Sequence, residues 1–231
     1  MGKLFDKLAQ DVRIKEGLTA CINCGTCTAI CPAAGFYDYD PRLIVNTVQT
    51  HDDEQIEALL KSETIWYCGE CMSCKTRCPR GNAPGMIIQA LRDLSQELGY
   101  FTESEKGRQQ LAIKRTIGEN ILKYGYCVYP DELNTEFNPE LGPMWDWEKE
   151  NIDAIMNRLG ANYKGAGAGT LRQISQESLD ELQQIFDVSG GTRRFQQIED
   201  FSDVKAKEMG FEDTNEYFVH VYTTNNDKHC K

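Results

Sequence analysis

The chain contains one cysteine pattern twice. Residues 21–32 read CINCGTCTAICP and residues 68–79 read CGECMSCKTRCP, so Cys-x2-Cys-x2-Cys-x3-Cys-Pro recurs at an offset of 47 residues. Three thiolates spaced by two residues point into one bowl formed by a single loop, where they reach three corners of a cubane iron-sulfur cluster. A fourth ligand has to come from another part of the chain. The repeat therefore requires a fold that completes two such loops.

The fourth cysteine of each motif is the candidate for the missing ligand. In two-cluster bacterial ferredoxins, the distant fourth cysteine of each run binds the other cluster. The same rule predicts two [4Fe-4S] clusters, with every iron bound by protein and none open to a substrate. We therefore expect one-electron transfer, with any bond-breaking chemistry on another subunit. The predicted ligands are Cys21, Cys24, Cys27 and Cys78 for the first cluster, and Cys68, Cys71, Cys74 and Cys31 for the second.

Zinc is the main alternative for these cysteines, because Cys-x2-Cys pairs also form structural zinc sites. A zinc site has four ligands and usually a longer stretch of sequence between its two cysteine pairs. Two copies of a three-cysteine loop followed by Cys-Pro therefore favour iron-sulfur clusters over zinc. A disulfide framework is disfavoured, because the chain has 231 residues and begins MGKLFDKLAQDVRIKEGL, without an apolar signal-peptide core. Outside the motifs, Cys127 is expected to be a buried thiol, and Cys230 with His229 to lie in a disordered tail.

Charge and hydropathy limit the classes of partner. The formal net charge is −11, which argues against nucleic acid. Residues 126–231 carry 10 Lys and Arg against 20 Asp and Glu, so they hold nearly all of the excess. This part is either a solvated acidic surface or a docking face for a basic partner. Because no apolar run approaches the roughly 18 residues of a membrane span, we expect a soluble cytoplasmic protein.

Helical signals follow the first motif and continue beyond the second. Asp40 and Pro41 predict the start of a helix, and another is expected over residues 52–61. Pro84 opens a helix that ends at Gly99. Thr102 and Glu105 form a capping box for a long helix that ends near residue 124. We take residues 1–125 as an amino-terminal domain and 126–231 as an acidic extension for subunit docking.

The extension is expected to be mostly helical with one short strand. Residues 126–145 should be extended, a helix fits 146–159, and the glycine-rich stretch 165–169 should be a flexible joint. Ser178 with Glu181 predicts a capping box for a helix through residue 186, and further helical pieces fit 193–200 and 203–209. The alternating stretch EYFVHVYTT at 216–224 predicts a strand. GAGAG lacks the spacing and context of a nucleotide-binding loop, and no catalytic constellation is visible.

Three segments carry a resemblance to a known family: ACINCGTCTAICP, YDYDPR and WYCGECMSCKTRCPRG. Over residues 15–100 the chain resembles the C subunit of heterodisulfide reductases, which has an α-helical ferredoxin domain. The resemblance implies a mainly α fold, two [4Fe-4S] clusters on the eight motif cysteines, and electron relay between a flavin-containing A subunit and a catalytic B subunit. Related domains often carry Cys-Cys pairs of a fused catalytic domain, and this sequence has none. The resemblance therefore implies a separate, non-catalytic subunit.

The part beyond residue 125 departs from the shorter form found in methanogens. It looks more like the heterodisulfide-reductase-like complexes of sulfur oxidisers, which implies a role in sulfur metabolism. Two other functions remain open at this point. One is a freestanding two-cluster ferredoxin or the iron-sulfur subunit of a glycolate, lactate or glycerol-3-phosphate oxidising system. The other is a metal module with only a structural role.

Overall fold

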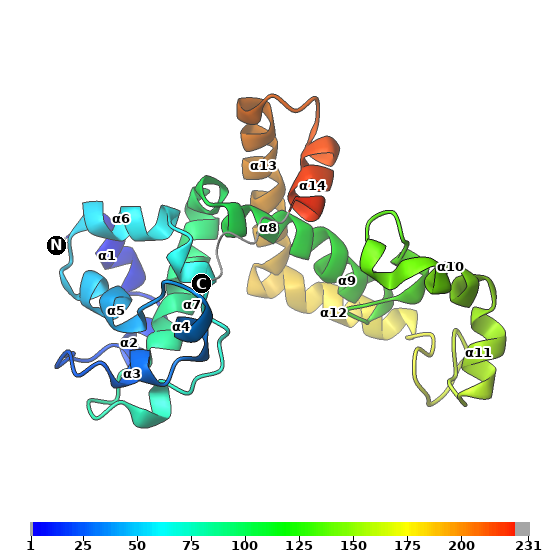
Figure 1. Cartoon of the computed structure of the whole chain (residues 1–231), viewed down its shortest axis with the longest axis horizontal. Helices are drawn as coiled ribbons and strands as arrows, with labels where there is room; N and C mark the ends of the chain where they lie inside the picture. The colour runs from blue at the N-terminus through cyan, green and yellow to red at the C-terminus, as the bar shows by residue number, and fades with distance from the viewer. Residues whose placement is uncertain (1, 225–231) are drawn as a thin grey trace. The chain divides into compact units, whose positions relative to one another are not determined.

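The structure is a computed structural model that describes residues 2–224 (Figure 1). Within that range every regular element is a helix. None of these helices combines the length and the apolar character that a membrane-crossing helix needs. The α-helices are α1 (Lys3–Leu8), α2 (Val12–Gly17), α3 (Thr26–Ala29), α4 (Pro32–Phe36), α5 (Pro41–Gln49), α6 (Asp53–Lys61), α7 (Pro84–Leu98), α8 (Glu105–Ile113), α9 (Glu119–Tyr124), α10 (Gly142–Glu150), α11 (Ile152–Arg158), α12 (Gln176–Ser189), α13 (Gly191–Met209) and α14 (Thr214–Thr223).

The described chain divides into two compact units, residues 2–108 and 109–224. The first contains α1 to α7 and both cysteine motifs. The predicted domains, 1–125 and 126–231, describe where the ferredoxin domain ends rather than where the contacts divide the chain. These two limits stay a prediction. The first unit has a helical core from which the cysteine loops emerge. Its most buried side chains include Leu8, Ile44, Val45, Val48, Ile56, Leu60, Ile65, Ile87, Ile88 and Leu91.

The predicted cap at Asp40 is present, and the helix expected over 52–61 begins one residue later because Asp52 is its cap. Asp40 accepts hydrogen bonds from the amides of Arg42 and Leu43 at the start of α5, and Asp52 caps α6 in the same way. Pro84 stands at the first position of α7, and Gly99 ends that helix with φ at 80°. A left-handed residue at this position suits glycine because it has no Cβ. These local signals position the helices that hold the two loops.

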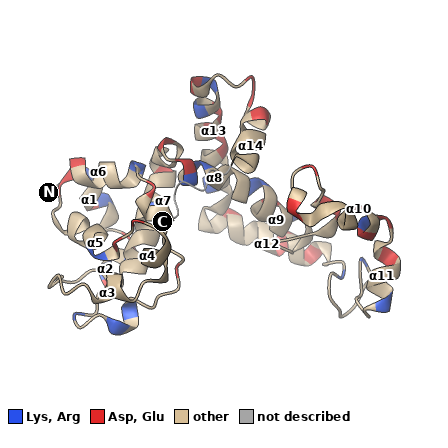
Figure 2. Cartoon of the chain, in the orientation of Figure 1, with Lys and Arg blue, Asp and Glu red and all other residues tan. Residues whose placement is uncertain are grey.

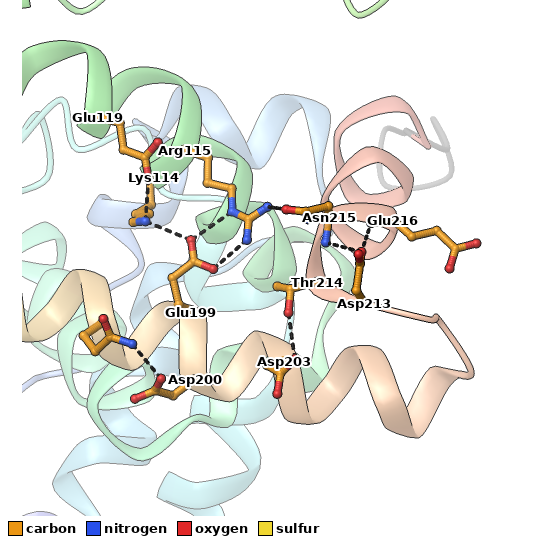
Figure 3. Close-up of polar contacts among 11 residues, drawn as sticks. Lys114, Arg115, Glu119, Glu199, Asp200, Asp203, Asp213, Thr214, Asn215 and Glu216 are labelled. Atoms are coloured by element: carbon orange, nitrogen blue, oxygen red, sulfur yellow. Dashed lines mark hydrogen bonds and ion pairs between the residues drawn. The ribbon is translucent and has the colours of Figure 1, made fainter. Parts of the chain in front are cut away.

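The second unit has a smaller core and a half-buried ion network. Leu111, Ala206 and Tyr217 are fully buried. Between α8 and α9 the helix widens into one turn of π-helix, Lys114–Gly118. Figure 3 shows Glu199 of α13 between Lys114 and Arg115, with Glu199 Oε2 2.7 Å from Arg115 Nη2 and Oε1 2.8 Å from Lys114 Nζ. These pairs join α13 to the π-helix.

The predicted strand at 216–224 is wrong, because these residues form most of α14. Asp213 accepts hydrogen bonds from the amides of Asn215 and Glu216, which starts a helix. Tyr217 and Val221, four residues apart, are the buried side chains of α14. A helix places residues i and i+4 on one face, whereas a strand alternates every two residues. Burial on one helical face therefore overrides the strand preference of the aromatic and β-branched residues.

Several predicted boundaries differ from the structure. Ser104 accepts a hydrogen bond from the amide of Gly107, so it takes the capping role predicted for Thr102. Ser175, three residues before Ser178, caps α12. The two pieces expected over 193–209 form one helix, α13, and the helix expected over 146–159 is divided into α10 and α11. Part of the segment expected to be extended is helical, since α10 begins at Gly142.

Candidate metal centre

The two cysteine loops have matching backbone conformations. Asn23 and Glu70 occupy equivalent positions and have φ of 60° and 55°. In this left-handed conformation the amide of Asn23 lies 3.3 Å from Cys21 Sγ, and the amide of Glu70 lies 3.4 Å from Cys68 Sγ. Such N–H···S contacts favour the thiolate form that a metal requires. The sequence repeat is therefore also a repeat of the local structure.

The middle cysteine of each triad is exposed and faces a hydroxyl group. Cys24 Sγ lies 3.4 Å from Thr26 Oγ1, and Cys71 Sγ lies 3.5 Å from Ser73 Oγ. The hydroxyl of Thr26 lowers the pKa of Cys24, and that of Ser73 lowers the pKa of Cys71. The third cysteine of each triad differs, because burial raises the pKa of Cys27 and of Cys74.

The first predicted ligand set surrounds one cavity. Its walls include Cys21, Cys24 and Cys27 of the first motif together with Cys78 of the second. Cys78 is 51 residues from Cys27 in the sequence. The rest of the wall is mainly apolar. It comes from residues within and near the motifs, including Ile22, Gly25, Val45, Pro79 and Pro84. A pocket lined by four thiols from two loops has the donor chemistry that an iron-sulfur cluster requires.

The second ligand set shows the reciprocal arrangement. The pKa of Cys74 is raised mainly by burial, and the neighbouring thiols of Cys68 and Cys31 raise it further. Cys31 belongs to the first motif, where it precedes Pro32 at the start of α4. The fourth cysteine of each motif thus lies beside cysteines of the other motif. Cys71 is the exposed member of the second triad.

The donors in this region are thiols. Within residues 2–224, no three His, Cys, Asp or Glu side chains are placed to hold a single ion. A tetrahedral zinc site needs its ligands about 2.0–2.3 Å from one ion, whereas a [4Fe-4S] cluster has a separate cysteine for each iron. Buried donors without a hydrogen-bond partner among residues 2–224 occur at both sets, Arg42 Nε and Asn82 Nδ2 beside the first and the Tyr39 hydroxyl beside the second. Thiol donors, matched amides and an unsatisfied donor all fit a bound iron-sulfur cluster.

Helix α5 anchors the first loop. The amide of Cys21 donates to Gln49 Oε1 at 3.3 Å, and Gln49 Nε2 donates to the Thr19 carbonyl at 2.5 Å. Asn46 Nδ2 donates to Asn23 Oδ1 at 3.1 Å. Thr28 donates to Asp40, the residue that caps α5. The first loop is therefore held at both ends of its cysteine triad.

Arg92 of α7 anchors the second loop. Its Nε donates to the Ile65 carbonyl and its Nη2 to the Cys68 carbonyl, both at 2.7 Å. Its Nη1 donates to Glu70 Oε1 at 2.6 Å. The Arg92 side chain is 17% exposed, so these bonds are largely shielded from water. The motif spacing does not identify Arg92 or Tyr39, because neither residue lies in the repeat.

The remaining predicted residues have different outcomes. Three large side chains, Trp66, Tyr67 and Met72, lie in or beside the second motif. Trp66 and Tyr67 are half-buried and pack against the core of the first unit, while Met72 Sδ would lie 3.0 Å from a Cβ added at Gly85. Cys127 is exposed rather than buried, because its segment lies on the surface of the second unit. Cys230 and His229 lie outside the described residues.

Comparison with known proteins adds the evolutionary context. Residues 8–82 match the 4Fe-4S dicluster domain. The chain is 40% identical over 163 residues to the C subunit of the ferredoxin:CoB-CoM heterodisulfide reductase of Methanosarcina acetivorans, which covers 70% of this chain and 62% of that protein. It is 33% identical over 152 residues to the C2 subunit of the H(2)/formate:CoB-CoM heterodisulfide,ferredoxin reductase of Methanococcus maripaludis, which covers 64% of this chain and 75% of that protein.

A third similar protein is the second iron-sulfur C subunit of the CoB–CoM heterodisulfide reductase of Methanocaldococcus jannaschii. It is 32% identical over 136 residues, which cover 59% of this chain and 66% of that protein. The chain thus spans somewhat less than two thirds of the first of these relatives and about two thirds of the third. The match with the Methanosarcina acetivorans protein is longer than the 125 residues of the predicted ferredoxin domain. Its likeness to a methanogen protein therefore extends beyond the cysteine motifs.

Proposed function

Because this chain belongs to the family of heterodisulfide reductase C subunits, we propose that it is an electron-transfer subunit with two [4Fe-4S] clusters. The observation that carries the proposal is the cavity in which Cys78 joins Cys21, Cys24 and Cys27. Cys31 beside Cys68 and Cys74 supplies the reciprocal half. Eight thiolates leave no iron open to a substrate, so the protein passes electrons and does not itself transform a substrate.

The polypeptide contributes four kinds of help to electron transfer. The thiolates hold the clusters, which supply the one-electron chemistry when bound. The amides of Asn23 and Glu70 and the hydroxyls of Thr26 and Ser73 stabilise negative charge on sulfur. The apolar cavity wall limits water around the first set. Arg92 and the side chains of α5 keep the two loops at fixed positions, which preserves the spacing between ligands from different motifs.

The partners we propose are a flavin-containing A subunit and a catalytic, Cys-Cys-bearing B subunit. Support comes from the second unit, where α10, α11 and α12 bury none of their residues. Short helices gain most of their stability from tertiary packing, yet Trp147 is 54% exposed and Val188 is 87% exposed. Such apolar side chains favour a docking role for the part beyond residue 125. Acidic residues lie along the same helices (Figure 2).

The relatives in methanogens are named for the CoB-CoM heterodisulfide. We infer that this protein serves the same type of complex, with the reacting disulfide bound elsewhere. The part beyond residue 125 also shows similarity to a methanogen protein. The length of this part is therefore no reason to prefer a complex of sulfur oxidisers over one of methanogens. Participation in sulfur oxidation stays a prediction, and identifying the reaction of a co-purified B subunit tests it.

The crossed ligation is tested with a matched pair of variants, Cys78→Ala and Cys31→Ala. Each is purified without oxygen and alkylated, and mass spectrometry then identifies the cysteines that react. In Cys78→Ala we expect the triad of residues 21–27 to become reactive while that of residues 68–74 stays protected. Cys31→Ala should give the opposite result. If each variant instead exposes the triad of its own motif, the ligation is not crossed.

Two further measurements test the proposed role. The purified wild-type chain should contain about eight iron and eight sulfide, because two cubanes require that number, and about two zinc per chain would contradict the cluster assignment. Co-expression with candidate A and B subunits should give a stable complex, with slower hydrogen exchange in residues 142–189. A monodisperse monomer in the presence of both subunits would contradict the docking role.

A further inference from the structure

The hydroxyl group of Tyr39 is a buried donor without a hydrogen-bond acceptor of standard geometry among the described residues. Only 4% of Tyr39 is exposed to solvent. Nearly all buried polar groups in folded proteins have a partner, so each exception calls for an explanation. Burial without a partner costs free energy. The position of Tyr39 therefore indicates a hydrogen-bond acceptor that is completed only when a ligand is bound.

The surroundings of Tyr39 identify that acceptor. Cys31 and Cys68 both pack against the buried cluster that contains Tyr39, and the Cys68 thiol is the side chain with which the Tyr39 hydroxyl interacts most strongly. Cys68 and Cys31 come from different motifs, and both are ligands assigned to the second cluster. Tyr67 holds the ring of Tyr39 edge-on, with the two ring centres 6.3 Å apart. The hydroxyl is thus fixed beside the second ligand set.

The Tyr39 hydroxyl is not repeated at the position that the sequence repeat makes equivalent to it. The other contacts to sulfur occur in both loops, from the amides of Asn23 and Glu70 and at the hydroxyls of Thr26 and Ser73. The position 47 residues after Tyr39 is Met86. A thioether has no proton to donate. The first ligand set has buried donors of another kind, since Arg42 Nε and Asn82 Nδ2 belong to residues that line its cavity and have no hydrogen-bond partner among the described residues. Tyr39 therefore differs from its equivalent position in carrying a hydroxyl.

We propose that the Tyr39 hydroxyl donates a hydrogen bond to the Cys68 sulfur of the second cluster and raises the reduction potential of that cluster. Reduction adds one electron, and the negative charge that it brings is shared with the sulfur ligands. A donor beside sulfur stabilises this reduced form more than the oxidised form. Tyr39 is a positioning residue that tunes the cluster through Cys68. The inference rests on the proposed function and adds a residue that tunes the second cluster.

The test is the substitution Tyr39→Phe, which removes the hydroxyl and keeps the ring. Wild type and variant are titrated without oxygen, and electron paramagnetic resonance follows each cluster. At a fixed ambient potential, we expect the ratio of reduced to oxidised second cluster to fall about three- to tenfold. A tenfold change corresponds to about 59 mV for a one-electron couple. The signal of the first cluster should keep its midpoint.

The matched control is Tyr37→Phe, the same chemical change two residues away. Tyr37 is half-buried and stacks on Tyr67 with ring centres 4.5 Å apart, so it tests for a general effect of the aromatic group. The signals are assigned in the Cys78→Ala background, in which only the second cluster should remain. An unchanged second midpoint, an equal shift in Tyr37→Phe, or a shift of the first cluster instead would each overturn the proposal.

A second measurement covers the case in which Tyr39→Phe fails to hold its clusters. Site-specific 3-fluorotyrosine at position 39 keeps the ring and strengthens the hydroxyl as a donor, so the second midpoint should rise. A fall or no change would contradict the proposal. Iron and sulfide are measured on every sample. Absence of clusters from the wild type would refute the proposed function, whereas a normal cluster content with an unshifted midpoint refutes only the role of Tyr39.

Discussion

Arg92 should be the side chain outside the cysteines on which the second loop most depends. It donates to the carbonyls of Ile65 and Cys68 and to the carboxylate of Glu70. Replacing Arg92 with Met keeps an unbranched, apolar stem of helix-compatible shape but removes all three donors. Two backbone carbonyls beside the first cysteine of the second motif then lose their partners. The substitution therefore perturbs the loop without changing any ligand.

The expected size follows from those contacts. A hydrogen bond from a charged donor contributes about 1.5–3 kcal/mol. The ion pair with Glu70, whose side chain is 43% exposed, should add less than about 1 kcal/mol. Water reaches part of this loop, so we take the low end for each carbonyl. The loss is then about 3 kcal/mol for local opening of residues 65–70, or roughly a 100-fold larger opening constant.

Hydrogen exchange of the cluster-loaded chain measures this opening. Amides of residues 63–74 should exchange roughly 100-fold faster in Arg92→Met, and a chelator should remove iron faster from the second cluster than from the first. Arg13→Met is the matched control. Arg13 pairs with two carboxylates, those of Asp11 and Asp93, and should cost less than about 1 kcal/mol.

The reasoning would be refuted by a specific result. If Arg92→Met leaves both hydrogen exchange and iron release at wild-type rates, the bonds to Ile65 and Cys68 do not hold the loop. If Arg13→Met accelerates hydrogen exchange and iron release as much as Arg92→Met does, the effect comes from losing any arginine in this unit and not from the bonds of Arg92 to the loop. Either outcome would show that Arg92 of α7 does not anchor the second loop.

Three further predictions concern packing and charge. Glu199→Gln should destabilise the second unit by about 1–3 kcal/mol, seen as faster hydrogen exchange in α13. In the wild type, burial alone would raise the pKa of Glu199, but hydrogen bonds from Arg115 and Lys114 outweigh it and lower that pKa. The stability that these bonds contribute is therefore present above pH about 4.5 and is lost as the pH falls further. Gly118→Ala should cost about 1–3 kcal/mol in thermal unfolding, because the added Cβ would lie 2.5 Å from Phe195 Cζ. Ser95→Ala should cost about 1 kcal/mol in the same assay, since it removes a buried 2.7 Å bond to the Leu60 carbonyl; no loss in either variant would contradict its assigned contact.

The elements around the cysteines could be predicted because their signals are local. Asp40 followed by Pro41 places an acceptor and a preset φ at the start of a helix, and Gly99 supplies the left-handed residue at the end of another. The spacing of the cysteines predicts three thiolates in each loop, since it reflects how many thiolates one loop can direct inward, while the crossed assignment of Cys31 and Cys78 stays a prediction. The causes of the helix ends lie within a few residues of their effects.

The features that could not be predicted depend on contacts between distant residues. Tyr217 and Val221 are buried on one face of α14, and only tertiary packing distinguishes that face from an alternating strand. Arg92 looks like any charged residue on a helix until the carbonyl of Ile65, 27 residues earlier, is placed beside it. Tyr39 likewise acquires a role only next to Cys68. A single sequence carries no local signal for these contacts.

The unequal exposure within each cysteine triad has a consequence for chemical damage. Cys24 and Cys71 are exposed, whereas the other six motif cysteines are partly buried. Oxidants reach accessible sulfur first, so both sites are open to oxidation at their central position. One lesion there removes a ligand from one cluster only. The fold thus leaves each ligand set with one exposed cysteine, which is its most oxidation-sensitive position.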